Sequence, residues 1–512
     1  MISGIGVVRS SAACHSMKDR LLTCNLVPRL GFLFSLSLVL PGASLPAFAM
    51  RGSLARAIIV PALTSGIAGT KPSLTTVNPK QSAVRHPNPP VSEQDSEKIG
   101  RERASKNEYK TGAYTLPPAL RKKARRYSRI QYAIYFGGVA LELVIYLALW
   151  LSGFGTWLRN LAARVSNHLF LQCLIFVPLF WVLVSILQFT LDFYSGYVVE
   201  HRFDLSTQSF PSWLADWGKA LGLTILVAIF AVWILYRVIR RSPRRWWLIF
   251  WLITLPLALF VMFIEPWVVE PLFYKYTLLE RTHPALTTRI EEMVHRAGID
   301  IPKSRIFEMS ASAKTRTLNA YVSGIGRSKR VVVWDNTLRE LSPDEILSVL
   351  AHETGHYALH HGLKEFTLDE LVALGWFLVG FLAAAAAVRR WGPKTGMENL
   401  GDLAGFPLLM LILTAILFLA SPIYCGISRY YEHQADQYGL ELTYGILPDP
   451  NESAVRSFEI LGKKDLTDPA PNPFIKFWLF IHPPLAERIR FAEHYKPWAE
   501  GKPMQLLHRP KQ

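Results

Sequence analysis

The chain has 512 residues, of which 50% are hydrophobic, and its 56 Lys and Arg residues outnumber 39 Asp and Glu residues to give a formal net charge of +17. A mean hydropathy of +0.20 and the gathering of apolar residues into long stretches exclude an ordinary soluble enzyme. The sequence has no CxxC pair and no glycine-rich phosphate loop, which argues against a disulfide framework, a thiolate metal site and nucleotide-driven chemistry. The four scattered cysteines are Cys14, Cys24, Cys173 and Cys425.

Residues 1–49 have the pattern of a targeting or anchoring segment. An apolar run over about 30–49 follows Lys18, Arg20 and Arg29, and it ends in the small-residue sequence Ala47-Phe48-Ala49. This order predicts either a signal peptide with a cleavage site or a retained first membrane span.

The next stretch, residues 50–130, is rich in Pro, Ser, Lys and Arg and has only one short apolar run, Ile58 to Val60. It holds 16 basic and 5 acidic residues, so it carries most of the net charge. Such a segment cannot bury enough surface to fold alone, and we predict a disordered basic linker over 50–117. It contains no basic domain with interleaved stacking aromatics, so nucleic acid is not the expected partner; anionic lipid headgroups or plain solvation remain.

Six apolar stretches are long enough to cross a bilayer core of about 30 Å, which takes roughly 20 helical residues. Four of them form a predicted membrane domain over 118–268, and two more lie within 366–425. The stretches cover about 131–152, 169–190, 219–239, 246–268, 371–388 and 404–425.

Between the spans, residues 269–365 can hold a small α+β core. The pattern predicts a helix over about 282–297 and strands over 304–309, 318–323 and 330–335. Gly324-Ile325-Gly326 separates the last two strands and favours a hairpin. An edge strand of this kind can grip an extended peptide by backbone pairing, or it can be purely structural.

The next predicted helix carries His352-Glu353-Thr354-Gly355-His356, the HExxH arrangement of zinc hydrolases. Residues i and i+4 share a helix face, so two imidazoles can bind one ion while Glu353 faces the position of an attacking water. Ser342, Pro343 and Glu345 predict a capping box at the start of the helix, and Gly362 is expected to end it after His361.

A catalytic zinc usually takes three protein ligands, and the best candidate for the third lies in the C-terminal piece, residues 426–512. Glu432 and Asp436 are four residues apart and share a helix face. Glu432 is therefore the predicted ligand, and Asp436 the partner that orients a ligand histidine. His433 is the competing ligand, but it would point about 100° away from that pair.

With these motifs in this order, the chain resembles the type I CAAX prenyl protease family of integral-membrane zinc metalloproteases. The resemblance spans about 117–495 and depends on five blocks in order. They are Glu270 to Tyr276 (EPLFYKY), Asn319-Ala320-Tyr321 with Lys329 to Val333, the HETGH helix, Ser428 to Asp436 (SRYYEHQAD) and His482 to Arg488 (HPPLAER).

The resemblance implies a mainly α-helical membrane barrel of six or seven spans around a water-filled chamber, with a small zincin-like catalytic part. It implies one Zn²⁺ per chain and a peptide or protein substrate, prenylated at its C-terminus in this family. Its residue roles make His352, His356 and Glu432 the ligands, Glu353 the general base and Asp436 the holder of a histidine. His482 and Arg488 would stabilise the oxyanion, and Asn319, Ala320 and Tyr321 would bind substrate.

These residues predict a metalloendopeptidase in which water is the nucleophile. Two alternatives remain open from the sequence. A membrane-protein quality-control protease would share the site without prenyl specificity. A non-enzymatic transporter or scaffold would keep only a relic of the fold, although the ligands and the base are all present.

Charge in the short loops bears on orientation. Loops on one side carry ten basic residues, whereas the opposite loop over 191–218 has only Arg202, with Lys219 just inside the next span. The positive-inside rule puts the ten in the cytoplasm and the catalytic part on the periplasmic or external side. Two observations favour the opposite orientation: the basic cluster Arg121 to Arg129, and the cytosolic site that the eukaryotic relatives imply. The ten are Arg159, Arg164, Arg237, Arg240, Arg241, Arg244, Arg245, Arg389, Arg390 and Lys394.

Overall fold

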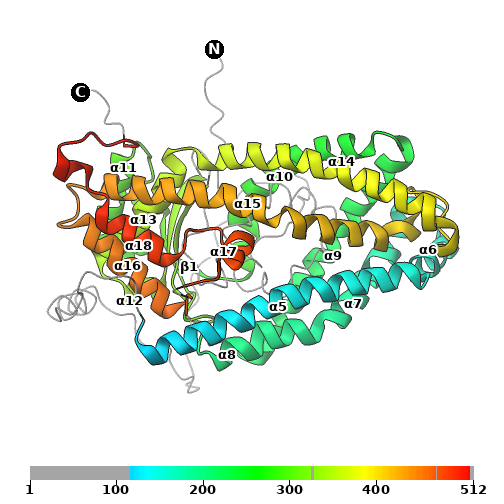
Figure 1. The fold of residues 1–512 in the computed structure, drawn as a ribbon, viewed down its shortest axis with the longest axis horizontal. Coiled ribbons are helices and arrows are strands. Elements are labelled where there is room, and N and C mark those ends of the chain that lie inside the picture. The colour runs from blue at the N-terminus through cyan, green and yellow to red at the C-terminus, as the bar shows by residue number, and fades with distance from the viewer. Residues whose placement is uncertain (1–115, 325–327, 469, 508–512) are drawn as a thin grey trace, which may run out of the picture.

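The structure, a computed structural model, describes residues 116–507 except 325–327 and 469. The predictions of a signal peptide or first span over 1–49 and of a disordered linker over 50–117 therefore fall almost wholly outside the described residues. The rest is mainly helical, with long apolar helices carrying a small α+β part at one end (Figure 1). The predicted fold class, a multi-span helical membrane protein with a small sheet, is confirmed.

Among the described residues, five helices are long and apolar enough to cross a membrane: α5 (Pro118–Leu151), α7 (Leu169–Phe193) with its continuation to Arg202, α9 (Phe210–Arg241), α14 (His361–Thr395) and α15 (Phe406–Thr443). A sixth apolar helix, α10 (Trp246–Val268), is shorter in its apolar part, Trp246–Val261. Each of the six predicted spans overlaps one of these helices. The α7 continuation consists of the π-helical turn η2 (Tyr194–Val199) and α8 (Glu200–Arg202), and α6 (Phe154–Val165) joins α5 to α7.

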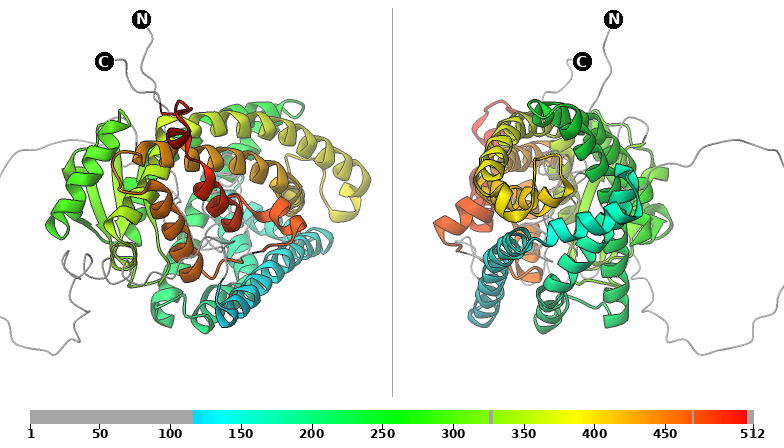
Figure 2. Two further views of the ribbon diagram at one scale, coloured as in Figure 1. Left: turned by 60° about the vertical axis from the view of Figure 1, so that its left-hand side comes forward. Right: turned by 90° about the vertical axis from the view of Figure 1, so that its right-hand side faces the viewer.

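Aromatic side chains fill the interior of the membrane bundle. The ring of Phe180 on α7 lies 4.9 Å from that of Phe406 on α15 and 6.2 Å from that of Tyr146 on α5. Large apolar side chains such as Ile186 and Leu382 lie more than half exposed on the outside. An exposed apolar surface of this kind suits contact with lipid. Viewed along the long axis, the helices form a ring (Figure 2, right).

The α+β part contains a four-stranded sheet in the order β1-β2-β4-β3. Its strands β2 (Ile306–Met309), β3 (Ala320–Ser323) and β4 (Arg330–Trp334) match the three predicted strands, and β3 and β4 pair antiparallel as the predicted hairpin. Strand β2 runs parallel to β4 and antiparallel to β1 (Tyr276–Leu278), which the sequence did not predict. The predicted helix over 282–297 is α11 (Pro284–Arg296).

The HETGH helix, α13 (Pro343–Ala358), begins as predicted. The Ser342 side chain accepts from the Glu345 backbone N–H at 3.4 Å, and the Glu345 carboxylate accepts from the Ser342 N–H at 2.7 Å. Its end is different, because the helix stops at Ala358 and α14 already begins at His361, so Gly362 lies inside α14 and does not end a helix. His360 makes the break itself, with the positive φ of 55° that glycine more often adopts.

Helix α15 continues without a break past the predicted end of the span at 425. The extension of this one helix carries Glu432 and Asp436 back to the α+β part, where α13 packs along it (Figure 1). The chain then adds α16 (Pro450–Lys464), α17 (Pro473–Leu479) and α18 (Leu485–His494), and α12 (Asp335–Glu340) precedes α13. Short 3₁₀ turns lie at Glu270–Leu272, Leu279–Arg281, Lys303–Arg305, Leu403–Gly405 and Pro497–Glu500.

Candidate metal centre

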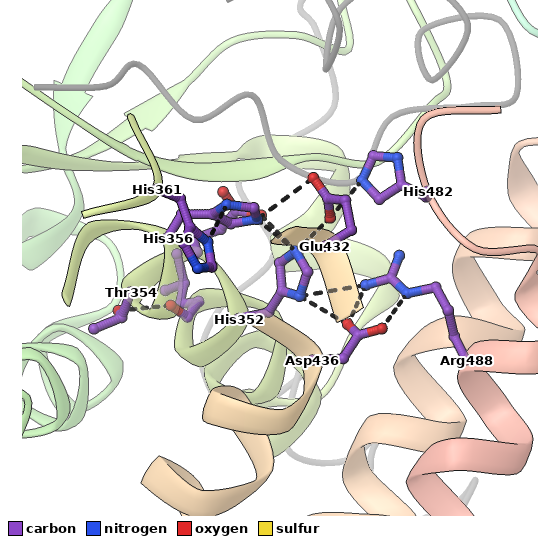
Figure 3. Close-up of polar contacts among 10 residues, drawn as sticks. His352, Thr354, His356, His361, Glu432, Asp436, His482 and Arg488 are labelled. Atoms are coloured by element: carbon purple, nitrogen blue, oxygen red, sulfur yellow. Dashed lines mark hydrogen bonds and ion pairs between the residues drawn. The ribbon is translucent and has the colours of Figure 1, made fainter. Parts of the chain in front are cut away.

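Three buried side chains from α13 and α15 converge at the centre of the α+β part (Figure 3). The Nε2 atoms of His352 and His356 are 3.3 Å apart. A Glu432 carboxylate oxygen lies 3.1 Å from His352 Nε2, and the other lies 3.5 Å from His356 Nε2. Helix α15 therefore brings Glu432 to the paired imidazoles, while His433, the competing candidate, is exposed with its ring 4.4 Å from Phe491.

These three spacings fit a tetrahedral ion. Zinc binds histidine nitrogen and carboxylate oxygen at about 2.0–2.1 Å, and the edge of a tetrahedron with such bonds is roughly 3.3 Å. The observed donor separations of 3.1, 3.3 and 3.5 Å lie on both sides of that length. Two imidazoles and one carboxylate are also a donor set that zinc prefers. The side chains therefore fit a zinc ion by both chemistry and geometry.

Two glycines let α13 and α15 approach closely enough to bring these three side chains together. A Cβ on Gly439 would lie 3.0 Å from the backbone nitrogen of His352, and one on Gly355 would lie 3.1 Å from the Cβ of Tyr438. Both contacts are at the limit of what real Cβ atoms tolerate. Larger residues at these positions would push the two ligand-bearing helices apart.

A further histidine, His482, reaches the same centre from the segment between α17 and α18. Its Nε2 lies 3.0 Å from Glu432 Oε2, and ligand atoms of His352, Glu432 and His482 lie within 4.8 Å of one another. The family resemblance implies only an oxyanion role for His482. Because it contacts the carboxylate directly, it is close enough to be a ligand as well, and the two roles need separate tests.

Asp436 holds His352 from behind. Its Oδ1 is 2.8 Å from His352 Nδ1, on the ring edge opposite the candidate ion. Burial lowers the pKa of His352, but hydrogen bonds to Asp436 and Glu432 outweigh burial and raise that pKa to about 10. A carboxylate on the far nitrogen fixes the tautomer and makes the near nitrogen a better metal ligand.

Arg488 lies against Asp436. Its Nε donates to Asp436 Oδ2 at 2.8 Å and its Nη2 to Oδ1 at 2.5 Å, and both side chains are buried. The guanidinium also lies over the ring of Phe458, 4.3 Å from its centroid. Since this guanidinium is committed to a carboxylate behind His352, its contacts are those of a counter-ion for Asp436.

The sequence did not single out His361, which contacts the second candidate ligand, His356. Its Nδ1 lies 3.2 Å from His356 Nδ1, and its Nε2 lies 3.1 Å from the amide oxygen of Gln434. Gln434 in turn donates to the Tyr430 hydroxyl at 3.3 Å. If His356 uses Nε2 for the ion, its Nδ1–H donates to His361, and the His361 Nε2–H donates to Gln434. One set of tautomers thus satisfies the whole chain of contacts.

Glu353 lies beside the ligands. Its carboxylate is 1% exposed and lies 3.7 Å from His352 Nε2. A buried carboxylate at this distance can take a proton from a water placed next to the ligands.

The predicted substrate strand is the sheet's edge strand β3, and it packs against α13. The Asn319 N–H donates to Thr337 Oγ1 at 2.7 Å, and its carbonyl accepts from Trp334 N at 3.0 Å, so the backbone of Asn319 is engaged within the α+β part. The Tyr321 hydroxyl donates to Glu270 at 2.9 Å.

Glu270 gives the EPLFYKY block a structural role. Besides Tyr321, it accepts from the Tyr276 hydroxyl at 2.7 Å and pairs with Arg330 of β4. This buried carboxylate therefore ties the end of the membrane domain to strands β1, β3 and β4.

Comparison with known proteins agrees with this geometry. Residues 280–496 match the family described as Peptidase family M48, and residues 111–275 match the CAAX prenyl protease N-terminal family, with five membrane helices. A relative from Bacillus subtilis, "Uncharacterized metalloprotease YhfN", is 33% identical over 378 residues, which cover 74% of this chain and 86% of the relative. The chain belongs to peptidase family M48.

Other relatives and a solved structure extend the comparison. CAAX prenyl protease 1 of Saccharomyces cerevisiae is 27% identical over 340 residues, covering 63% of this chain and 72% of the relative. The crystal structure of Ste24p from S. mikatae has the same fold, with a TM-score of 0.66 at 23% identity, over 78% of this chain and 95% of that one. The chain is thus a membrane metalloprotease that resembles the CAAX prenyl proteases, which disfavours the transporter or scaffold alternative.

Proposed function

We propose that this protein is a zinc-dependent metalloendopeptidase with one Zn²⁺ per chain, held by His352, His356 and Glu432. The observation that carries the proposal is the cluster of donor atoms: the two Nε2 atoms lie 3.3 Å apart, and the Glu432 carboxylate lies 3.1 Å from His352 through Oε2 and 3.5 Å from His356 through Oε1. When bound, the zinc ion would polarise the scissile carbonyl and acidify a water molecule. The catalytic work of the chain itself falls to the residues around this cluster.

Glu353 acts as the general base that takes the proton from water and later gives it to the leaving amine. His482 donates a hydrogen bond to the developing oxyanion. Arg488 keeps Asp436 ionised and in place, so that Asp436 orients His352; this makes Arg488 a positioning residue and leaves the oxyanion to His482. The Asn319 side chain and the backbone of Ala320 and Tyr321 hold the substrate strand next to α13.

The Glu353→Gln variant tests the base. The change keeps the shape of a side chain that is 1% exposed, so zinc content should stay at one ion per chain while peptide cleavage falls by about 10²–10⁴-fold. Undiminished turnover would remove Glu353 from the mechanism.

Ligand identity is tested by metal analysis of three purified variants. Glu432→Ala should lose zinc, and His433→Ala should keep it. His482→Leu should keep zinc and lose about 10²–10³-fold in kcat, the usual cost of deleting one oxyanion donor. Loss of zinc from His482→Leu would instead make His482 a fourth ligand. Retention of zinc in Glu432→Ala would favour His433 as the third ligand in place of Glu432.

We further propose that the substrate is a protein or peptide processed near a prenylated C-terminal cysteine. The support is the resemblance to relatives named CAAX prenyl proteases. The competing proposal is quality control of membrane proteins without prenyl specificity, which has the same catalytic residues. A farnesylated peptide should be cleaved at least tenfold faster than its unmodified twin; equal rates would favour quality control.

Orientation is proposed from charge. The three basic loops meet at the end of the bundle away from the metal centre, where Arg240 donates to the Gly401 carbonyl at 2.9 Å and Arg159 pairs with Asp402 at 2.5 Å. By the positive-inside rule this end is cytoplasmic, and the catalytic end is periplasmic or external. A reporter that is active only in the cytoplasm, fused after Gln512, should be silent; activity there would reverse the orientation.

A further inference from the structure

A strongly basic groove lies on the outside of the protein, at the catalytic end of the bundle. It has a volume of about 760 Å³ and runs between the first turns of α5 and the η2–α8 continuation of α7. Six of its nine lining residues are cationic and none is acidic. They are Arg121, Lys122, Arg125, Arg126, Arg129 and Arg202, accompanied by Pro118, Ile130 and Tyr194. Figure 1 shows the start of α5 beside α8 at this end.

The walls of the groove are held together by the carboxylates nearby. Tyr127 and Gln131 of α5 both donate to Glu200 Oε1, at 3.1 and 3.2 Å, and Lys123 pairs with Asp204 at 2.8 Å. These contacts fix α5 against α8. They also engage the two neighbouring carboxylates on the flank of the groove, so the six lining cations do not share them.

None of the six cations has an ion-pair partner among the residues that the structure describes, and the Arg121 Nε is buried with no hydrogen-bond partner there. Arg121, Arg125 and Arg129 follow at intervals of four on one helix face, where like charges repel one another. This repulsion destabilises the helix, and a bound anion would relieve it.

The depth of the groove indicates which kind of anion it can bind. Ile130 and Tyr194 form its inner end, next to the apolar stretches of α5 and α7, and Arg121 and Arg202 lie nine and eight residues farther out on their respective segments. Eight or nine helical residues span about 12–14 Å. The headgroup layer on each side of the hydrocarbon core is roughly 5–8 Å thick, so a groove starting at the core boundary passes through that layer. Tyr194, 40% exposed, has the amphipathic character of residues at that boundary.

We propose that this groove binds the phosphate-bearing headgroups of anionic phospholipids. Arginine is suited to this role because its planar guanidinium grips phosphate oxygens with two hydrogen bonds. The groove lies on the outer surface, apart from the metal centre, and the proposal does not depend on the identity of the protease substrate. Lipid bound here would brace α5 against α8 at the catalytic end of the bundle.

The test uses the full-length protein in a neutral detergent, titrated with short-chain phosphatidylglycerol and, separately, with phosphatidylcholine. Lipid binding is followed by native mass spectrometry and by the rise in Tm. The wild type should prefer phosphatidylglycerol. The triple variant Arg121→Gln/Arg125→Gln/Arg202→Gln should bind it about 100-fold more weakly, because each cation near a lipid surface contributes a factor of roughly 5.

A matched control removes the same charge from the other end of the bundle. Arg164→Gln/Arg241→Gln/Arg389→Gln changes three exposed arginines in the basic loops and should bind phosphatidylglycerol like the wild type. If the triple variant does not fold, the exposed pair Lys122→Gln/Arg126→Gln tests the same groove, with an expected loss of about 25-fold by the same factor per charge.

Three results would overturn the proposal. One is equal weakening in the groove variants and the loop control, which would mean that overall charge governs binding. Another is equal affinity for phosphatidylglycerol and phosphatidylcholine in the wild type. The last is the same rise in Tm with millimolar inorganic phosphate as with lipid, which would make the groove a site for a soluble anion. Peptide cleavage in detergent should be unchanged in the groove variants, which separates this proposal from the proposed protease mechanism.

Discussion

Replacing His361 with leucine should weaken zinc binding without touching any proposed ligand. His361 is 0% exposed, and its Nδ1 lies 3.2 Å from His356 Nδ1, on the side of the ring away from the ion. Leucine fills similar space but accepts no hydrogen bond, so the Nδ1–H of His356 becomes a buried donor without a partner. His356 would then be free to turn or to change tautomer, and either change costs zinc affinity.

The size of the effect follows from the burial of that donor. Leaving a buried donor unsatisfied costs about 1–3 kcal/mol, which corresponds to roughly 5- to 150-fold in the zinc dissociation constant. Loss of a partner on the far nitrogen of a ligand histidine typically costs 10–100-fold, within the same range. Gln434→Leu removes only the outer link, and because Gln434 is half-buried, water can replace it; its effect should be smaller.

The assay is competition for zinc between the metal-free protein and a chromogenic chelator at fixed pH, together with Tm in the presence and absence of zinc. His433→Leu is the matched control, since it changes an exposed histidine next to Gln434. A His361→Leu variant that binds zinc within twofold of the wild type would refute the reasoning. So would a His433→Leu variant as weak as His361→Leu.

Three further outcomes are expected. Gly439→Ala should lower Tm and weaken zinc binding by about 1–3 kcal/mol, because its Cβ would meet the His352 backbone at 3.0 Å. Gly375→Ala, with open space around it, should change neither, and equal effects in the two variants would contradict the close-packing argument. Zinc affinity should rise about tenfold per pH unit between roughly pH 6 and 9, because His352, with a pKa of about 10, must lose its proton to bind the ion; a flat affinity profile by competition titration would rule this out. Ser342→Ala should cost about 1 kcal/mol of stability to thermal unfolding and leave the zinc content unchanged; an unchanged Tm would show that the cap does not contribute.

The parts of the site that could be predicted are those set by local periodicity. The spacing of His352 and His356, the capping box at Ser342 and the shared face of Glu432 and Asp436 all follow from the 3.6-residue repeat. The three predicted strands have the same origin, in alternation and turn residues. Strand β1 was missed because three residues carry no pattern, and its pairing with β2 is decided by the sheet.

His361 could not be predicted for a different reason. Gly362 was expected to end the helix, which placed His361 at a helix terminus with no partner in view. The structure ends α13 at Ala358 and turns the chain at His360, and this left-handed residue is what aims His361 back at His356. Likewise, the sequence offers no means of deciding whether Arg488 faces an oxyanion or a carboxylate, because its partner Asp436 lies 52 residues away.

The metal centre depends on the membrane hairpin for its assembly. His352 and Asp436 are 84 residues apart, and closing a flexible loop of that length costs about 4 kcal/mol. Most of the intervening chain is α14 and α15, two helices of 35 and 38 residues. A bilayer admits such a pair only as spanning helices, and helices of nearly equal length return the chain to the level at which it entered. Membrane insertion therefore offsets much of the entropy lost in closing that loop before zinc binds. The ion then has only to order side chains on helices that already lie together.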